Sequence, residues 1–272
     1  MPRRDGRVIK MHALNAMFPY IMKTRTESLV YFNTSLDVEN LLNYIEKKKA
    51  EGIELKFFQI FMAAVVKLFK ERPHLNRFVM GRRVYQRNDI KISFIAKKAS
   101  TDEAEETNVT LTCNENTGFD DVIDKLKKDI KTAKSGEVKD DDALFRTVMK
   151  LPRFMLRIFF GILNWLDFYF EMPKVLADFD PLRCSAYVAN LGSIGIEAPF
   201  HHLYEWGTCS VFIAIGKIRY MPVALEDGSL VSKKMVEVKV TLDERIADGF
   251  YFARSLELME KYINNPESIE NM

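Results

Sequence analysis

The stretch "TLDERIADGFYFARSLE", residues 241–257, decides the C-terminal part of the fold. It closes a run rich in β-formers, "KKMVEVKVTLD" (233–243), and the pair Asp248-Gly249 predicts a turn. Beyond the turn, apolar residues recur at helical spacing, at Phe252, Leu256, Met259 and Ile263. The stretch therefore predicts a strand that enters a turn and continues into a helix with one apolar face.

Outward from this stretch, strands and helices alternate irregularly. Strand patterns occupy residues 28–38, 89–98, 109–113, 184–190 and 209–218. Helical patterns occupy residues 11–25, 39–52, 55–71, 119–136 and 151–171. Residues 101–108 are acidic and predict a loop, and residues 136–143 form the most linker-like stretch. We expect a two-layer α/β sandwich of the α+β type, in which helices cover a mixed sheet.

The composition is typical of a globular protein of one domain, residues 1–272. Its 40 basic and 38 acidic residues leave a net charge of +2, which gives no nucleic-acid signal. The start, "MPRRDGRVIK", lacks the apolar segment of a secretion signal, and we expect residues 1–10 to form a flexible arm. Three widely spaced cysteines, Cys113, Cys184 and Cys209, predict reduced thiols in a cytoplasmic protein.

The most apolar stretch, residues 151–171, tests whether the chain enters a membrane. Charged residues interrupt it, at Arg153, Arg157, Asp167 and Glu171. A spanning helix needs about 20 largely uncharged residues, so we expect no transmembrane segment. An apolar face at helical spacing comprises Leu151, Met155, Ile158, Ile162, Leu166 and Tyr169. This face predicts an added helix that packs on the domain or on a subunit neighbour, or that touches a membrane surface.

Four ordered stretches carry a resemblance that covers nearly the whole chain. "KERPHLNRFV" (70–79) is similar to a helix end, and "YVANLGSIGI" (187–196) to a Ser-Asn-Leu-Gly turn. "VFIAIGKIRYMPV" (211–223) resembles the strand after that turn, and "LDERIADG" (242–249) an Asp-His-Arg-x-x-Asp-Gly signature. In this order they resemble the catalytic domain of the dihydrolipoyl acyltransferases of 2-oxoacid dehydrogenase complexes. That domain shares its fold with chloramphenicol acetyltransferase.

The resemblance implies a chemistry and an assembly. It implies transfer of an acyl group between the thiol of coenzyme A and a second thiol or hydroxyl, with acyl-coenzyme A as a substrate and no metal. It also implies a homotrimer whose substrates enter a tunnel at the subunit interface from opposite ends. The acyl acceptor is open, either a small molecule or a carrier-bound group, and we expect a stand-alone domain without a lipoyl domain.

Two positions depart from the resembled pattern. Glu244 stands where the family has its general-base histidine, and Ala189 where it has its oxyanion serine. Asn190 and Asp248 are retained, and the resemblance places Asp248 in the catalytic group as a structural aspartate held by an arginine. Ala189, Asn190 and Gly216 are the positions expected to line the substrate site. A general base contributes about 10²–10⁴-fold in rate and an oxyanion donor about 10²–10³-fold. Glu244 either acts as a base with a pKa raised by burial, contacts a ligand, or pairs with an arginine.

A second candidate lies in "FHHLYEWGT" (200–208), which holds two of the four histidines of the chain. Histidine is suited to proton transfer near neutral pH, and Glu205 could orient the imidazole of His201 or His202. The alternatives are an interface loop in which Tyr204 and Trp206 are packed, and a metal site, which lacks a visible third ligand.

Three functions follow from these residues. The first is an acyl-coenzyme A-dependent acyltransferase in which Glu244, His201 or His202 takes the proton. The second is a catalytically inactive relative that acts as a trimeric binding or scaffold protein. The third is a membrane-surface protein that uses residues 151–171.

Overall fold

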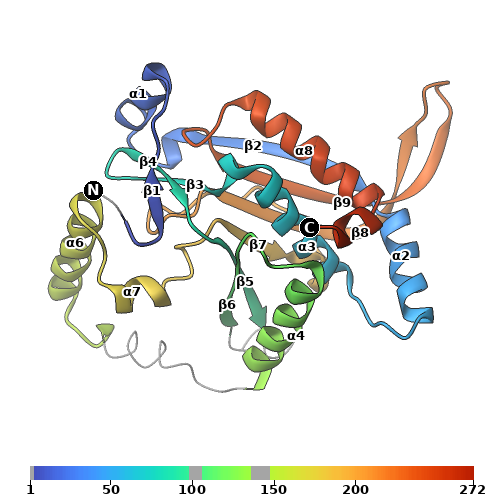
Figure 1. The fold of residues 1–272 in the computed structure, drawn as a ribbon, viewed down its shortest axis with the longest axis horizontal. Coiled ribbons are helices and arrows are strands. Elements are labelled where there is room, and N and C mark those ends of the chain that lie inside the picture. The colour runs from blue at the N-terminus through green and yellow to red at the C-terminus, as the bar shows by residue number, and fades with distance from the viewer. Residues whose placement is uncertain (1–2, 98–105, 136–147) are drawn as a thin grey trace.

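The computed structural model describes residues 3–97, 106–135 and 148–272, and its centre is a six-stranded mixed sheet (Figure 1). The strands lie in the order β2 (Leu29–Asp37), β9 (Leu230–Asp243), β8 (Val211–Ala224), β7 (Ala186–Asn190), β5 (Ile90–Lys97) and β6 (Glu106–Cys113). β7 runs parallel to both β5 and β8, and the other pairs are antiparallel. The mixed sheet predicted from the sequence is confirmed.

Helices cover one face of this sheet. They are α2 (Glu39–Ala50), α3 (Phe57–Glu71), α4 (Phe119–Ser135), α8 (Gly249–Asn264) and α9 (Glu267–Glu270). The main core lies between the two layers, and α3 runs through it with every residue from Gln59 to Phe69 buried. A helix that is apolar nearly all round must be covered on most sides, which is why residues 57–71 take this central place.

A small antiparallel sheet lies beside the main one, in the order β1 (Gly6–Val8), β4 (Arg83–Arg87) and β3 (Arg77–Met80). Short 3-10 turns, Thr26–Ser28 and Pro73–Asn76, precede β2 and β3, and α1 (Ala13–Ile21) follows β1. The sequence analysis did not predict this sheet. It also expected a free arm at residues 1–10, but residues 6–8 pair with β4 and Arg3 is buried.

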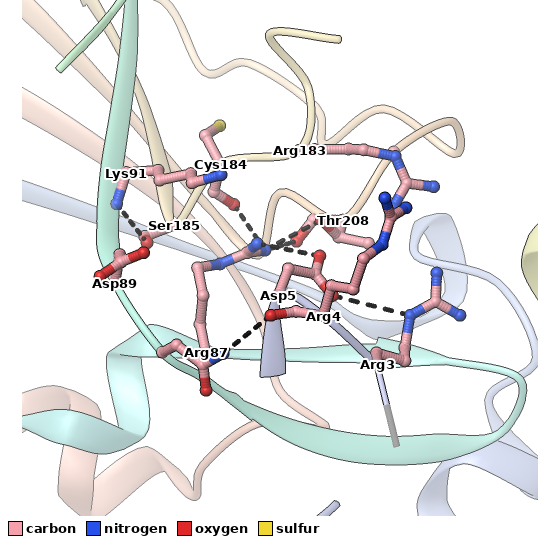
Figure 2. Close-up of polar contacts among 12 residues, drawn as sticks. Arg3, Arg4, Asp5, Arg87, Asp89, Lys91, Arg183, Cys184, Ser185 and Thr208 are labelled. Carbon is pink, nitrogen blue, oxygen red and sulfur yellow. Dashed lines mark hydrogen bonds and ion pairs between the residues drawn. The ribbon is translucent and has the colours of Figure 1, made fainter. Parts of the chain in front are cut away.

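Two further helices, α6 (Arg153–Tyr169) and α7 (Lys174–Phe179), lie at one end of the molecule (Figure 1). The buried carboxylate of Asp167 in α6 accepts hydrogen bonds from the guanidinium groups of both Arg3 and Arg183. Arg3 also reaches toward Asp5, which pairs with the buried Arg87 (Figure 2). Arg87 in turn donates to the carbonyl oxygens of Cys184 and Thr208. This network of arginines joins the N-terminal segment to α6 and to the loops around β7.

Three details differ from expectation. The predicted acidic loop, residues 101–108, ends in strand at 106–108, and its remainder and residues 136–143 lie outside the described residues. The predicted packing face of 151–171 is largely the exposed face of α6, since Met155, Ile158 and Ile162 are exposed. In the part of the chain that the structure describes, no helix is long and apolar enough to cross a bilayer.

Candidate active site

The turn after β9 presents Glu244 to solvent. Asp243, which is fully buried, accepts two hydrogen bonds from the Arg245 guanidinium, at 2.8 Å from Nε and 2.7 Å from Nη2. The Asp243 N–H donates to Ser210, and the Glu244 N–H donates to Ser28 at 2.9 Å. Among the described residues Glu244 has no ion-pair partner, so the arginine pairing considered for it falls to Asp243 instead. These hydrogen bonds hold the turn, and they leave the Glu244 carboxylate exposed, so the burial that the sequence analysis expected of a base at this position is not found within one chain.

Asp248, four residues after Glu244, has a structural role. Its side chain caps α8, since Oδ1 accepts a hydrogen bond from the Tyr251 N–H at 2.8 Å. An aspartate at this position satisfies a free N–H of the first turn and interacts favourably with the helix dipole. The structure therefore explains Asp248 as a helix cap.

A cavity of about 190 Å³ lies beside this turn. Its charged lining residues are the basic Lys23, Arg25, Arg82 and Arg245 and the acidic Asp167 and Glu205. Burial lowers the pKa of the Arg25 guanidinium, although the nearby Asp243 carboxylate opposes that change. Even with its pKa lowered, an arginine keeps its charge near neutral pH. The cavity therefore has a positive lining.

The end of β7 holds the second group of predicted residues. Ala189 pairs with Ala214 of β8, which pairs with Lys239 of β9. Gly192 follows in a 3-10 turn, where a Cβ atom would lie 2.4 Å from the carbonyl oxygen of Gly216. Gly216 itself sits at an irregularity of β8, and a Cβ there would lie 2.8 Å from the Ala198 nitrogen. Both glycines are therefore required by close approach of backbone segments, which explains Gly216 without a ligand.

The histidine pair lies on the face of the sheet opposite the main helices. Four rings stack in a column: the ring centroids of Tyr187 and Phe212 are 5.4 Å apart, those of Phe212 and His201 3.9 Å, and those of His201 and His202 4.8 Å. His201 Nδ1 lies 2.7 Å from the His202 carbonyl oxygen. Because a carbonyl can only accept, Nδ1 carries the proton and Nε2 keeps its lone pair. Burial lowers the pKa of His201, so its imidazole is neutral at pH 7.

Glu205 does not orient this pair. Its carboxylate accepts hydrogen bonds from the backbone N–H groups of Arg25 and Thr26 and from the Thr26 hydroxyl. Burial acts to raise the pKa of Glu205, but these hydrogen bonds outweigh it and the pKa is lowered. Trp206 donates to Asp180 at 2.8 Å and packs edge-on against Phe160. Glu205 is therefore not the predicted orienter, the role of His201 or His202 as a base stays a prediction, and the packed Trp206 is confirmed.

The predicted residues form two groups within one chain. His201 stacks on Phe212, two residues from Ala214 on the same face, so His201 and Ala189 lie on one face of the sheet, where the segment after β7 covers Phe212 and Ala214 in a second buried cluster. Glu244 stands five residues beyond Lys239, the β9 residue level with Ala189. Four residues at about 3.3 Å per residue place Asp243, the last residue of β9, about 13 Å further along the strand, and Glu244 follows it.

Lys239 is a residue of this face that the sequence analysis missed. Its ammonium lies 4.4 Å from the centroid of the Phe200 ring, and Phe200 contacts Tyr31 edge-on at 5.7 Å. The alternation in "VEVKVTLD" could have found it, because Val238 and Val240 enter the main core and Lys239 must point the other way. In the described part of the chain, no group of three or more His, Cys, Asp or Glu residues could hold a metal ion.

Comparison with solved structures defines the fold class. The chain is similar over 97% of its length to a probable dihydrolipoamide acetyltransferase from Listeria monocytogenes 4b F2365, with 95% of that chain covered, a TM-score of 0.60 and 17% identity. It is similar over 99% to the cubic core of a pyruvate dehydrogenase multienzyme complex, with 98% of that chain covered, a TM-score of 0.63 and 14% identity. A chloramphenicol acetyltransferase matches with a TM-score of 0.55 and 12% identity, over 96% of this chain and 98% of that one. The fold is that of the chloramphenicol acetyltransferase type.

Sequence comparison adds a likeness to one family over part of the chain. Residues 183–270 match the model of the 2-oxoacid dehydrogenases acyltransferase (catalytic domain) family, a range that holds both groups of candidate residues. The chain is also 25% identical, over 81% of its length, to the lipoamide acyltransferase component of a branched-chain alpha-keto acid dehydrogenase complex from Bacillus subtilis (strain 168). The matched part is 43% of that relative. The resemblance to the 2-oxoacid dehydrogenase acyltransferases is confirmed.

Proposed function

We propose that the chain transfers an acyl group from a coenzyme A thioester to a small-molecule or carrier-bound acceptor, and that Glu244 is the general base. The observation that carries this proposal is the accessible Glu244 carboxylate on a turn locked by the buried Asp243–Arg245 pair. A carboxylate held in a fixed position can take a proton repeatedly without reorganising its surroundings. The match of residues 183–270 to an acyltransferase family supports the reaction class.

The proposed reaction needs one proton acceptor and one oxyanion site. The Glu244 carboxylate removes the proton from the acceptor thiol or hydroxyl, whose heteroatom attacks the thioester carbonyl carbon. The tetrahedral intermediate collapses, the carbon–sulfur bond breaks, and the departing coenzyme A thiolate regains the proton. Ala189 offers no side-chain donor, so the Asn190 amide or a backbone N–H would have to stabilise the oxyanion. A weaker oxyanion site predicts a slow enzyme.

The positive cavity beside the turn supports an anionic donor. Its basic residues outnumber its acidic ones, and Lys23 and Arg82 line it together with Arg25 and Arg245. The phosphates of coenzyme A are the anionic part of the proposed substrate, and arginine suits phosphate recognition. We expect Lys23→Ala/Arg82→Ala to weaken coenzyme A binding at least tenfold.

The separation of the two groups supports an assembly of copies. Because Glu244 follows the end of β9, about 13 Å from the level of Ala189 in one chain, we infer that a second copy completes a site with both residues. A homotrimer, in which residues 1–272 act as one catalytic domain, is the proposed form. The open sheet face, with Tyr31 and Ile95 exposed, is the surface available for this contact. The three free, buried cysteines suit the proposed cytoplasmic location.

A specific observation favours His201 as the alternative base. Its neutral imidazole keeps an accepting Nε2 and lies on the same face as Ala189. The alternative to catalysis is a trimeric binding or scaffold protein, which the missing hydroxyl at Ala189 favours.

The test combines binding and turnover. Calorimetric titration with coenzyme A and acetyl-coenzyme A comes first, followed by release of free thiol with a panel of thiol and hydroxyl acceptors. Glu244→Gln should leave binding unchanged and lower turnover about 10²–10⁴-fold. Glu257→Gln, an exposed carboxylate on α8, is the matched control and should change neither.

Each other outcome assigns the site differently. Loss of turnover in His201→Gln/His202→Gln, with Glu244→Gln active, would identify the imidazole as the base and overturn the assignment to Glu244. Saturable binding without turnover, even in Ala189→Ser/Glu244→His, would support the scaffold protein. No binding at millimolar coenzyme A would exclude the donor.

A further inference from the structure

Helix α6 turns a large apolar surface outward. Its outward residues, between 38% and 65% exposed, are Phe154, Met155, Ile158, Ile162, Trp165, Phe168 and Tyr169. Met149, Phe170 and Val175, just outside the helix, extend this surface. Exposed apolar residues scattered singly need no explanation, but a contiguous set along one helix marks an interaction surface. We call the seven residues of α6 the outer face.

The opposite side of α6 is fixed to the body of the protein. Leu163 and Asp167 are buried, and the Asp167 carboxylate lies between the guanidinium groups of Arg3 and Arg183. Phe159 and Phe160 line an apolar cavity of about 170 Å³ on this inner side. The outer face is therefore presented in one orientation, and it cannot be buried by a rotation of the helix that keeps these contacts.

The charges around the outer face are basic. Residues 148–177 contain four basic side chains, Lys150, Arg153, Arg157 and Lys174. The two acidic ones are neutralised, Asp167 by Arg3 and Arg183 and Glu171 by Arg4 at 3.1 Å. At about 100° per residue, Arg153 and Arg157 fall along one edge of the outer face. The patch thus combines exposed Trp, Tyr, Phe and Ile side chains with a flank of arginines.

We propose that α6 docks on the surface of an anionic bilayer and lies in the plane of the interface. A helix with one apolar and aromatic face and a basic flank has the chemistry that binds at this depth. Arginine reaches the lipid phosphates while its stem stays on the apolar side, and Trp and Tyr suit the boundary between headgroups and acyl chains. No described helix is long and apolar enough to span the bilayer, and the proposal places α6 at its surface.

The position of α6 favours lipid over a second copy of the chain. α6 lies at one end of the molecule, whereas the long β8–β9 hairpin extends at the other (Figure 1). The open face of the sheet, with Ala189 and Lys239, is formed by β9, β8 and β7 and includes no residue of α6. We therefore expect contacts between copies that complete the proposed active site to use the sheet face and not the outer face. Asn164, Asp167 and Phe168 of α6 line the positive cavity, whereas Ile158 and Trp165, which the test changes, do not, so membrane docking can be measured apart from turnover.

The test is co-sedimentation of the full chain with vesicles of phosphatidylcholine alone and of phosphatidylcholine with about one third phosphatidylglycerol. We expect binding to the anionic vesicles only, weakened by salt. Ile158→Ser/Trp165→Ser should lower the partition at least tenfold. Each arginine removed, at Arg153 and Arg157, should cost about fivefold, because one basic residue near an anionic surface contributes about that factor.

The controls use matched residues elsewhere on the surface. Tyr220→Ser/Leu230→Ser removes two apolar side chains that are 65% and 72% exposed on the β8–β9 hairpin and should bind vesicles as the wild type does. Lys47→Glu/Lys49→Glu on α2 controls for net charge. Circular dichroism and sedimentation velocity follow the fold and the oligomer. Equal binding by all variants, no binding by the wild type, or loss of the oligomer together with vesicle binding in Ile158→Ser/Trp165→Ser would each overturn the proposal.

Discussion

Asp243 and Arg245 form a buried ion pair with two hydrogen bonds, and the residue between them, Glu244, points to solvent. The same arginine donates to the carbonyl oxygen of Met22, 3.0 Å away, which joins the turn to the segment after α1. The pair thus links two distant parts of the chain around one accessible carboxylate. The position of Glu244 is therefore set by the buried Asp243–Arg245 pair, which belongs to the folded core.

Removing one partner of this pair should destabilise the protein strongly. Asp243→Ala leaves Arg245 buried without its counter-charge, and we expect a loss of about 3–5 kcal/mol in the free energy of unfolding. Urea unfolding followed by circular dichroism measures it. Glu257→Ala breaks the exposed pair with Arg254 and should change stability by less than about 1 kcal/mol. A loss at Asp243 no larger than at Glu257 would show that the buried pair does not hold the turn.

Stability should fall between pH 7 and pH 5 because of two histidines. Burial lowers the pKa of His201 and of His74 below the usual 6.5, so the unfolded chain takes up these protons first as the pH falls. The free energy of unfolding then decreases as the pH drops through about 6.5, and the loss stops growing below the folded-state pKa values.

The substitution His201→Gln should make this pH dependence shallower. His74→Gln should do so separately, because His74 stacks on Tyr251 far along the chain from the ring column. Urea midpoints at about pH 7.5 and pH 5 give the comparison. An unchanged difference between the two midpoints in His201→Gln would contradict the assignment.

Two glycine substitutions should have opposite effects. Gly192→Ala places a Cβ atom 2.4 Å from the Gly216 carbonyl oxygen, so the turn after β7 must move, at a cost of about 1–3 kcal/mol. Gly161→Ala lies in the middle of α6 with no atom within 4 Å of the new Cβ, and should stabilise the protein by about 0.5–1 kcal/mol. Thermal unfolding distinguishes them, and a neutral Gly192→Ala would mean that the two backbones are less close in solution.

The Cys113 thiol should be unreactive in the folded protein. It is 1% exposed, and burial raises its pKa to about 11. At about pH 8 only about one thiol in a thousand is then a thiolate, the form that reacts. Iodoacetamide labelling with peptide mapping should find Cys113 unmodified until denaturant is added. Labelling of Cys113 in the native protein at the rate of a free cysteine would contradict the burial.

Local patterns predicted the layers of the fold well. Helix α3 is apolar on nearly every side, and β9 alternates with a period of two, so both could be placed from the residues alone. The small sheet was missed because β1 has three residues and β4 contains two arginines, a pattern too short and too polar to read as a strand. The order of residues 3–8 depends on the hydrogen bond between Arg3 and Asp167. These residues are separated by 164 positions, so no local pattern could have predicted the contact.

The candidate site was predicted in part. The strand–turn–helix around Glu244 follows from "LDERIADG", but the buried partner of Arg245 could not be chosen from sequence, since Asp243, Glu244 and Asp248 were all near it. The ring column of Tyr187, Phe212, His201 and His202 joins a loop to two strands. Such a contact is set by tertiary structure, and no spacing in the sequence encodes it.

The clamp on Asp167 has a consequence for the order of folding. The Asp167 carboxylate joins α6 to Arg3, which lies 164 positions earlier in the chain. Bringing two such distant residues together costs conformational entropy, and contacts of this kind form late in folding. We therefore expect α6 to dock after the main sheet has formed, and to open on its own while the sheet stays folded. In hydrogen exchange, the amides of α6 would exchange together and faster than those of the main sheet. The opening that exposes them would break the bonds of the Asp167 carboxylate to Arg3 and Arg183.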